Sequence, residues 1–278
     1  MRGVLPCGCY KCPACKINRT RMWKARCIAE YKDTGKGSFL TLTYSDEHLP
    51  KNGSLCPEHV TNFVKRLRNK VIGGLRYYYV GEYGDVRERP HYHMLLFGHT
   101  VDSICDDTGQ SLRQVVDSEW KYGHVYYGTM TVDSVGYTVG YLNKRKFFKN
   151  DPNLRGRHKE YARMSRKPAL GSNIVDEIVD VVNKYGIDGR DVNVINVGGN
   201  KLPLGRTIKE KIRDGLHIEK ENPQNSEYVK ELQRLRREET KEGSSIFNTP
   251  KDAYQKRHTQ EFRNQSVRLE LSKRRQNL

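Results

Sequence analysis

Two histidines spaced two residues apart are the first side chains in this sequence that could do chemistry. His91 and His93 stand at the start of an apolar segment. Residues two apart in a β-strand point to the same face, so both imidazoles could hold one metal ion. Glu82 ends the preceding apolar segment and can reach the same ion if the two strands pair; Glu88, in the connecting loop, is the weaker candidate. Such a ligand set leaves positions open for a substrate phosphate, although an isolated His-x-His pattern is more often an ordinary surface pair.

A second group lies on a predicted helix that opens at Asp133 or Ser134. At about 100° per residue, Tyr137, Tyr141 and Lys144 fall on one stripe of this helix. Aromatic stripes usually pack into a core, but here a separate aliphatic stripe on the opposite side can do so, formed by Val135, Val139 and Leu142. A tyrosine hydroxyl has a pKa of about 10, so as a nucleophile it needs a base or a nearby cation. Its attack on a phosphodiester would form a phosphotyrosine link and free a hydroxyl.

Four cysteines near the N-terminus form the third group: Cys7, Cys9, Cys12 and Cys15. They are too close together for independent disulfides, and thiolates at this spacing favour a structural Zn²⁺, with an iron–sulfur cluster as the alternative. Four ligands within so short a segment would wrap the ion tightly, so one ligand could come from elsewhere, for example Cys27. Free thiols in an unstructured arm are the less favoured alternative, and we expect a structural zinc that orders the basic helix that follows.

Charge defines the class of partner. The 278 residues contain 50 Lys and Arg against 33 Asp and Glu, a net charge of +17, which predicts a polyanionic partner, with nucleic acid as the leading candidate. No apolar run approaches the roughly 18 residues of a membrane span, and no signal peptide is recognisable, so we expect a cytoplasmic protein that does not bind membranes. No phosphate-binding loop of the ATPase type occurs. Strand separation would therefore depend on a host helicase.

The order of predicted elements indicates an α+β protein built on an antiparallel sheet. Strands adjacent in sequence alternate with helices, and two segments are strongly basic: 1–32 with a net charge of +7 and 144–167 with +8. The predicted helices are 17–31, 57–71, 111–121, one opening near 133, and 173–185; the predicted strands are 39–44, 76–82, 92–98, 124–131 and 192–197.

Three ordered motifs resemble those of the HUH rolling-circle replication endonucleases: residues 39–44, 91–93 and 137–144. The resemblance is closer still to the replication initiators of gokushovirus-type microviruses, which are bacteriophages with circular single-stranded DNA. It rests on Cys-x-x-Cys-x-x-Cys, Phe-Leu-Thr-Leu-Thr-Tyr, Val-Gly-Glu-Tyr-Gly, Arg-Pro-His-Tyr-His and Ser-Arg-Lys-Pro, and it covers about residues 7–170.

This resemblance implies a nickase that cuts single-stranded origin DNA, stays attached to the 5′ end through tyrosine and leaves a 3′-OH for the host polymerase. It implies Mg²⁺ or Mn²⁺ as the catalytic ion, held by His91 and His93, with Glu82 as the third ligand on grounds of strand proximity. Tyr137 and Tyr141 match the paired nucleophiles, with Tyr137 expected to attack first, and Lys144 matches the lysine that contacts the scissile strand. It also places the protein in the cytoplasm of a bacterial host.

We therefore expect a central antiparallel sheet of about five strands in the RNA-recognition, ferredoxin-like arrangement, with helices packed on one side and the histidines on a central strand. The chain divides into a Cys-rich basic arm and helix (1–35), an endonuclease domain (36–170), a folded extension (171–215) and a charged tail, helical or disordered (216–278). Two alternatives stay open: a zinc-ordered nucleic-acid-binding protein without catalysis, and a plasmid relaxase or HUH transposase.

Overall fold

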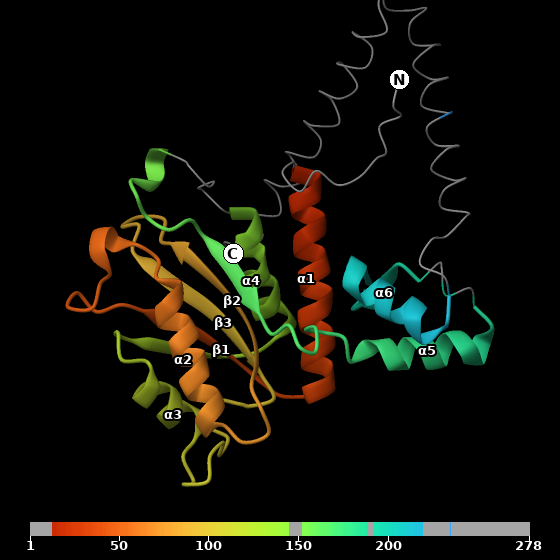
Figure 1. Ribbon diagram of the computed structural model, residues 1–278, viewed down its shortest axis with the longest axis horizontal. Coiled ribbons are helices and arrows are strands. Elements are labelled where there is room, and N and C mark those ends of the chain that lie inside the picture. The colour runs from red at the N-terminus through yellow and green to blue at the C-terminus, as the bar shows by residue number, and fades with distance from the viewer. Residues whose placement is uncertain (1–12, 145–151, 188, 190–191, 219–233, 235–278) are drawn as a thin grey trace, which may run out of the picture.

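A computed structural model describes residues 13–144, 152–187, 189, 192–218 and 234 (Figure 1). Helices and strands follow the predicted order, with an additional strand at 161–164, a second strand after 197 and an additional helix at 206–215. The helices are α1 (Pro13–Thr34), α2 (Pro57–Lys70), α3 (Leu112–Glu119), α4 (Val132–Lys144), α5 (Ile174–Tyr185) and α6 (Arg206–Gly215). The strands are β1 (Gly37–Thr43), β2 (Arg76–Tyr83), β3 (Pro90–Phe97), β4 (Val125–Thr129), β5 (Tyr161–Met164), β6 (Val194–Val197) and β7 (Asn200–Pro203).

The main sheet has five strands in the order β4-β1-β3-β2-β5, and every neighbouring pair is antiparallel. This confirms the predicted α+β class and the antiparallel sheet. Strands β2 and β3 pair across the loop that joins them, as their spacing predicted, and β3 occupies the centre of the sheet. The two histidines therefore lie on a central strand.

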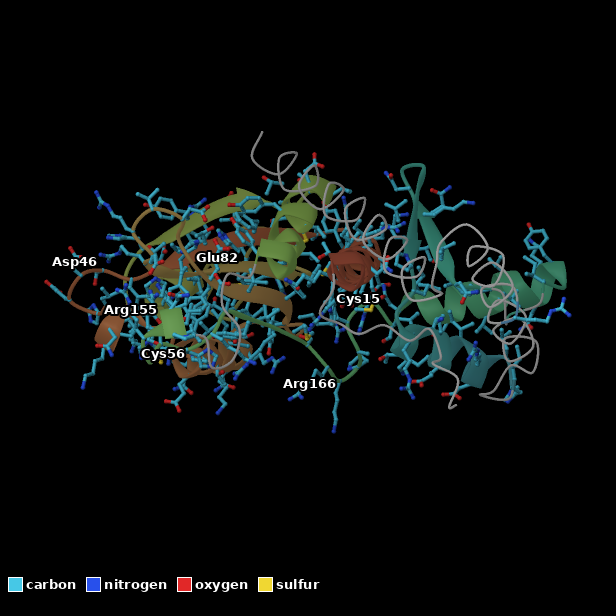
Figure 2. The ribbon with its side chains drawn as sticks, turned by 90° about the horizontal axis from the view of Figure 1, so that it is seen from above. Cys15, Asp46, Cys56, Glu82, Arg155 and Arg166 are labelled. Carbon is cyan, nitrogen blue, oxygen red and sulfur yellow. The ribbon has the colours of Figure 1, made fainter. Side chains whose placement is uncertain are left out.

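Both faces of the sheet are covered, so the expectation of helices on one side is wrong. Leu40 of β1 and Met94 of β3 belong to a buried cluster with residues of α2 and α3, whereas Leu95 of β3 belongs to a second cluster with residues of α1 and α4. Figure 1 shows α2 and α3 in front of the sheet, and Figure 2, seen from above, shows α4 on the opposite side from α2. Apolar residues occur on both faces of the strands, as at Met94–Phe97 of β3, and such a continuous apolar run is typical of a strand buried on both sides.

Helix α1 is held to the sheet by buried polar contacts as well as by apolar packing. Glu30 is 3% exposed, forms an ion pair with Arg76 of β2, and accepts a hydrogen bond of 2.6 Å from the backbone N–H of Gly171. The Arg26 guanidinium donates to the carbonyl of Leu170 at 2.7 Å. Gly171 has φ +70, and a Cβ there would lie 2.5 Å from the carbonyl oxygen of Arg26, so this close approach requires glycine. These contacts tie α1 to both β2 and the segment that follows β5.

The C-terminal part of the described chain forms a smaller layer beside α1. Helices α5 and α6 and the hairpin β6–β7 enclose a cluster that contains Val175, Leu204, Ile208 and Ile212. Figures 1 and 2 both place α1 between this layer and the main sheet.

Several predictions fall outside the described residues. Of the four clustered cysteines, the structure describes only Cys15, which is half-buried on α1. The charged tail lies almost entirely beyond residue 218. Within the described segments, no helix is long and apolar enough to cross a membrane.

The buried Glu30 contacts predict a large loss of stability when its carboxylate is removed. Glu30→Ala leaves the partly buried Arg76 without its counter-ion, so we expect the free energy of unfolding to fall by about 3 kcal/mol in urea titrations. Asp33→Ala, an exposed acid on the same helix, is the control and should change stability by less than about 0.5 kcal/mol. Equal effects of the two variants would contradict this role for Glu30.

Candidate active site

The two histidines and Glu82 meet on the sheet face that α4 covers. In the pairing of β2 with β3, Glu82 stands directly opposite His91. Its Oε1 lies 2.7 Å from Nε2 of His91 and 3.3 Å from Nε2 of His93. One ligand atom from each residue lies within 4.8 Å of the other two, so a single metal ion could contact all three. Glu88, the alternative ligand, is instead paired with Arg157 at 2.8 Å.

Local sequence explains this close approach. Gly81 precedes Glu82, and a Cβ at Gly81 would lie 3.0 Å from the ring of Tyr92 on the face covered by α2. Tyr92 itself is fully buried and accepts a hydrogen bond from the backbone N–H of Cys56. The glycine makes room for this ring, and Glu82, His91 and His93 point to the opposite face.

Burial and charge act in opposite directions on the pKa values of this group. Burial alone raises the pKa of Glu82, but its hydrogen bonds and charge interactions with His91 and His93 outweigh that effect and lower it. Burial likewise lowers the pKa of His91, and the hydrogen bond to Glu82 and its negative charge outweigh burial and raise it. Without a metal ion, the pair is therefore stable as a carboxylate and an imidazolium.

The remaining imidazole nitrogens are held by neighbouring groups. Nδ1 of His91 lies 3.1 Å from the carbonyl oxygen of Arg89, and Nδ1 of His93 lies 3.0 Å from the hydroxyl of Thr41. A carbonyl oxygen can only accept, so Nδ1 of His91 donates to it; deprotonation then occurs at Nε2, the nitrogen that faces Glu82. Ligand histidines in metal sites are typically oriented in this way. The geometry and chemistry of the three residues fit a divalent cation.

Both tyrosines of α4 lie against His93. The ring of Tyr141 stacks on the imidazole with centroids 4.7 Å apart and an interplanar angle of 9°, and the ring of Tyr137 meets it edge-on at 5.3 Å. The hydroxyl of Tyr141 donates to the hydroxyl of Tyr137. Val135 and Val139 are fully buried against the sheet, as the helical spacing predicted.

The two hydroxyls differ in their surroundings. Burial, followed by the negative charge of Glu82, raises the pKa of Tyr141, so that its hydroxyl stays protonated and able to donate. Tyr137 accepts the Tyr141 hydrogen bond. The two tyrosines therefore take different roles in this hydrogen bond, Tyr141 as donor and Tyr137 as acceptor.

Two residues that the sequence assigned to sites, Lys144 and Cys27, are not placed beside the histidines, Glu82 and the tyrosines. The backbone of Lys144 closes α4, but its side chain lies outside the described residues. Cys27 is fully buried between α1 and the sheet and about 18 Å along the same helix from Cys15, so it cannot join an ion bound at Cys15.

Sequence reasoning missed Thr41 and Phe39, which contact His93 from β1. Phe39 stacks on the imidazole at 5.8 Å, and Thr41 pairs directly with His93 in the sheet. Their alternation with Leu40 and Leu42 would have shown that they share a face, but only the register of β1 against β3 shows which histidine they meet.

Comparison with known proteins identifies the family. A family model for replication-associated proteins of the ORF2 type matches residues 37–146, the segment that contains the histidines, Glu82 and both tyrosines. The replication-associated protein VP4 of Bdellovibrio phage phiMH2K is 33% identical over 216 residues, which span 73% of this chain and 66% of that protein. The chain belongs to this family of phage replication-associated proteins.

Other members are similar over shorter segments. The replication-associated protein ORF2 of Spiroplasma virus 4 is 34% identical over 152 residues, and ORF4 of Chlamydia phage 1 is 30% identical over 154 residues. These segments span 49% and 50% of this chain, respectively, but only 48% and 38% of the relatives. No solved structure matches this member of the replication-associated protein family.

The contact between Glu82 and His91 predicts a specific titration. In metal-free protein, His91 should titrate above its ordinary pKa of 6.5, as measured by NMR of the imidazole resonances. Glu82→Gln removes the charge and leaves the burial, so the pKa of His91 should fall relative to the wild type. Glu88→Gln is the matched control and should leave His91 unchanged.

The same pair makes stability depend on pH. It stabilises the fold below the raised pKa of His91 and above the lowered pKa of Glu82, and its contribution is lost as pH passes either limit. A wild-type His91 that titrates below 6.5 would contradict the ion pair.

Proposed function

We propose that this protein is a replication initiator that nicks single-stranded origin DNA through a tyrosine nucleophile. The contact of Tyr137 and Tyr141 with His93 carries the proposal, because it brings two nucleophiles to a set of metal ligands within one partly buried site. Membership of the replication-associated protein family, and the names of its phage relatives, support a role in DNA replication. The net charge of +17 fits a DNA substrate.

In the proposed reaction, the Tyr137 oxygen bonds to the phosphorus and the bond from phosphorus to the 3′ oxygen breaks. The phenolic proton passes through solvent to the leaving 3′ oxygen, which becomes the free 3′-OH. The phosphodiester bond energy is retained in the 5′-phosphotyrosine link, so a later attack by a 3′-OH can rejoin the strand. Tyr141, one helical turn away, donates to the attacking oxygen and is placed for a second attack after the first adduct forms.

Glu82, His91 and His93 would hold the divalent ion, for which we propose Mg²⁺ or Mn²⁺. When bound, such an ion polarises the scissile phosphate and offsets its negative charge. The protein residues bind it with His91 neutral, so binding displaces the proton shared with Glu82 and weakens as pH falls through the raised pKa of His91. The carbonyl of Arg89 and the hydroxyl of Thr41 fix the orientation of the two imidazoles.

The remaining sequence-based roles belong to the same proposal. We assign Lys144 to the scissile-strand phosphate and the N-terminal cysteines to a structural zinc. We also retain the division of the chain into arm, endonuclease domain, extension and tail. The host polymerase would extend the 3′-OH, a host helicase would separate the strands, and both steps would take place in the bacterial cytoplasm.

Purified protein incubated with labelled single-stranded origin DNA and Mn²⁺ tests the proposal on a denaturing gel. We expect a protease-sensitive adduct that EDTA prevents, that Tyr137→Phe reduces at least about a hundredfold, and that the double variant with Tyr141→Phe abolishes. His93→Ala should also abolish it, because it removes a ligand for the ion.

Tyr126→Phe is the matched control, since Tyr126 is exposed on β4, and it should form the adduct at the wild-type level. DNA binding without any adduct would contradict the proposed function and favour a binding protein without catalysis.

A further inference from the structure

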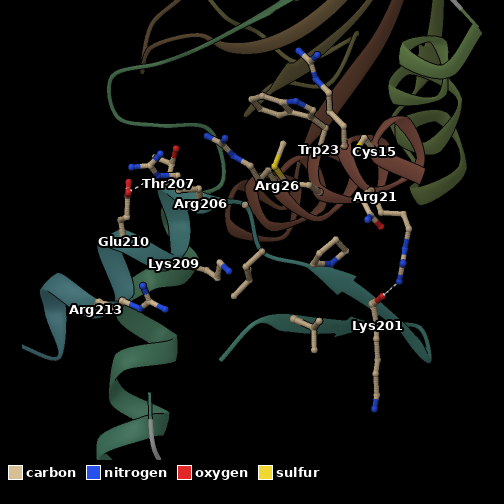
Figure 3. Close-up of a pocket in the computed structure, with 17 residues that line it drawn as sticks. Cys15, Arg21, Trp23, Arg26, Lys201, Arg206, Thr207, Lys209, Glu210 and Arg213 are labelled. Carbon is tan, nitrogen blue, oxygen red and sulfur yellow. Dashed lines mark hydrogen bonds and ion pairs between the residues drawn. The ribbon is translucent and has the colours of Figure 1, made fainter. Parts of the chain in front are cut away.

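A large recess lies on the far side of α1 from the tyrosine helix. It has a volume of about 1190 Å³ and lies between α1, the β6–β7 hairpin and the start of α6 (Figure 3). Segments almost two hundred residues apart form its walls, so the recess was not visible in the sequence. None of the residues of the candidate active site lines it.

The lining of the recess is strongly basic. Helix α1 contributes Arg19, Arg21 and Arg26. The opposite wall contributes Lys201, Arg206, Lys209 and Arg213. Among the described residues that line the recess, Glu210 is the only acid, and it is paired with Arg206 at 2.7 Å. Cations therefore strongly outnumber carboxylates in this lining.

A cluster of cations of this kind is stabilised when an anion binds to it. Burial lowers the pKa of Lys209, and the nearby positive charge of Arg213 lowers it further. Burial also lowers the pKa of Arg26, which packs over the indole of Trp23 at 4.3 Å. Groups whose charged forms are destabilised in the free protein gain most when a negative ligand arrives.

The start of α6 adds a fixed positive dipole. The helix begins at Arg206 after Gly205, and no side chain caps its N-terminus. A Cβ at Gly205 would lie 2.5 Å from the sulfur of Met22, so glycine lets this end of α6 approach α1 closely. The positive end of a helix next to clustered arginines is a favourable position for phosphate oxygens.

A cation also lies on the other side of α1. A Cβ at Gly136 would lie 3.2 Å from Nζ of Lys24. This lysine therefore lies beside the tyrosine helix at Gly136, the residue that precedes Tyr137. Lys24 therefore adds a positive charge where α1 meets the tyrosine helix. Helix α1 thus lines the recess and also packs against α4.

We propose that the recess binds the sugar–phosphate backbone of the single-stranded DNA that flanks the cleaved phosphate. This inference rests on the proposed function for the position of the cleaved phosphate, but the binding itself does not require cleavage. Cations on facing walls can surround one phosphate chain, whereas a duplex is more readily bound by a single open surface. Trp23 is only 9% exposed, so phosphate contacts rather than base stacking provide the binding, and little dependence on base sequence is expected here.

The test measures binding of a mixed-sequence single-stranded oligonucleotide by fluorescence anisotropy, in EDTA so that no cleavage occurs. A first variant of the recess, called the groove variant below, combines Arg19→Gln, Lys209→Gln and Arg213→Gln. Each phosphate contact on a single strand contributes about 0.7 to the dependence of log K on log salt, so the slope should fall by about 2. At about 0.1 M salt, this corresponds to an affinity about a hundredfold lower.

The matched control removes three exposed lysines outside the recess: Lys36→Gln, Lys51→Gln and Lys121→Gln. It has the same net charge as the groove variant and should retain most of the wild-type affinity. A second groove variant, with Arg19→Lys and Arg213→Lys, keeps the charge and should also bind the oligonucleotide. Its binding shows whether the first variant lost affinity through loss of charge or through loss of folding.

Equal weakening in the groove variant and the control would overturn the proposal, as would unchanged affinity in the groove variant. A clearly higher affinity of the wild-type protein for the matching duplex would overturn the proposal that the recess binds single-stranded DNA. Failure of the proposed function is a separate result. If the wild-type protein binds the oligonucleotide through the recess in EDTA but never forms an adduct, only the nicking reaction is contradicted.

Discussion

The register of the central strands is the constraint on which the candidate site depends. Because both faces of the sheet are buried, a slip of one residue between β2 and β3 would turn His91 and His93 toward α2 and bring Tyr92 into the space beside α4. The apolar residues of β3 thus fix which face the histidines occupy. The same register places Glu82 opposite His91 and Thr41 opposite His93, so packing energy positions the ligands and the groups that orient them.

Electrostatic interactions link Glu82 and His91 to helix α4. In the metal-free protein, the carboxylate of Glu82 favours an imidazolium at His91 and a protonated hydroxyl at Tyr141. A divalent ion bound at these residues would offset the negative charge that favours both protons. Helix α1 helps to hold α4 against the sheet. Its Glu30 contacts tie it to β2, and its apolar residues pack with those of α4.

Much of the fold was predictable because local patterns agreed with the tertiary structure. The alternation in 39–44 and the aliphatic stripe of Val135 and Val139 predicted their elements and buried faces correctly. The coverage of both sheet faces was missed, although the continuous apolar run of β3 and the aliphatic stripe of α4 both indicate it. The basic composition of α1 hid its share in that coverage. The strand β5 was missed because Tyr161–Met164 lies in a basic segment and becomes a strand only by pairing with β2.

The sequence named the residues of the candidate site and predicted that Glu82 meets the two histidines, but not how α4 packs against them. The His-x-His spacing and the helical periodicity indicated the two groups separately, and family resemblance joined them. The stacking of Tyr141 on His93, the hydrogen bond between the tyrosines and the recess behind α1 depend on how α4 and α6 pack, which no local pattern encodes.

Peptide mapping of the protein–DNA adduct by mass spectrometry tests the central claim most directly. After digestion with trypsin and nuclease, the peptide that runs from Tyr122 to Lys144 contains both candidate nucleophiles. We predict a nucleotide attached through phosphate to Tyr137 in this peptide, formed only when a divalent ion is present. Attachment at a residue outside α4, or at the same level without a divalent ion, would contradict the claim that the tyrosines and the three ligand residues form one catalytic site.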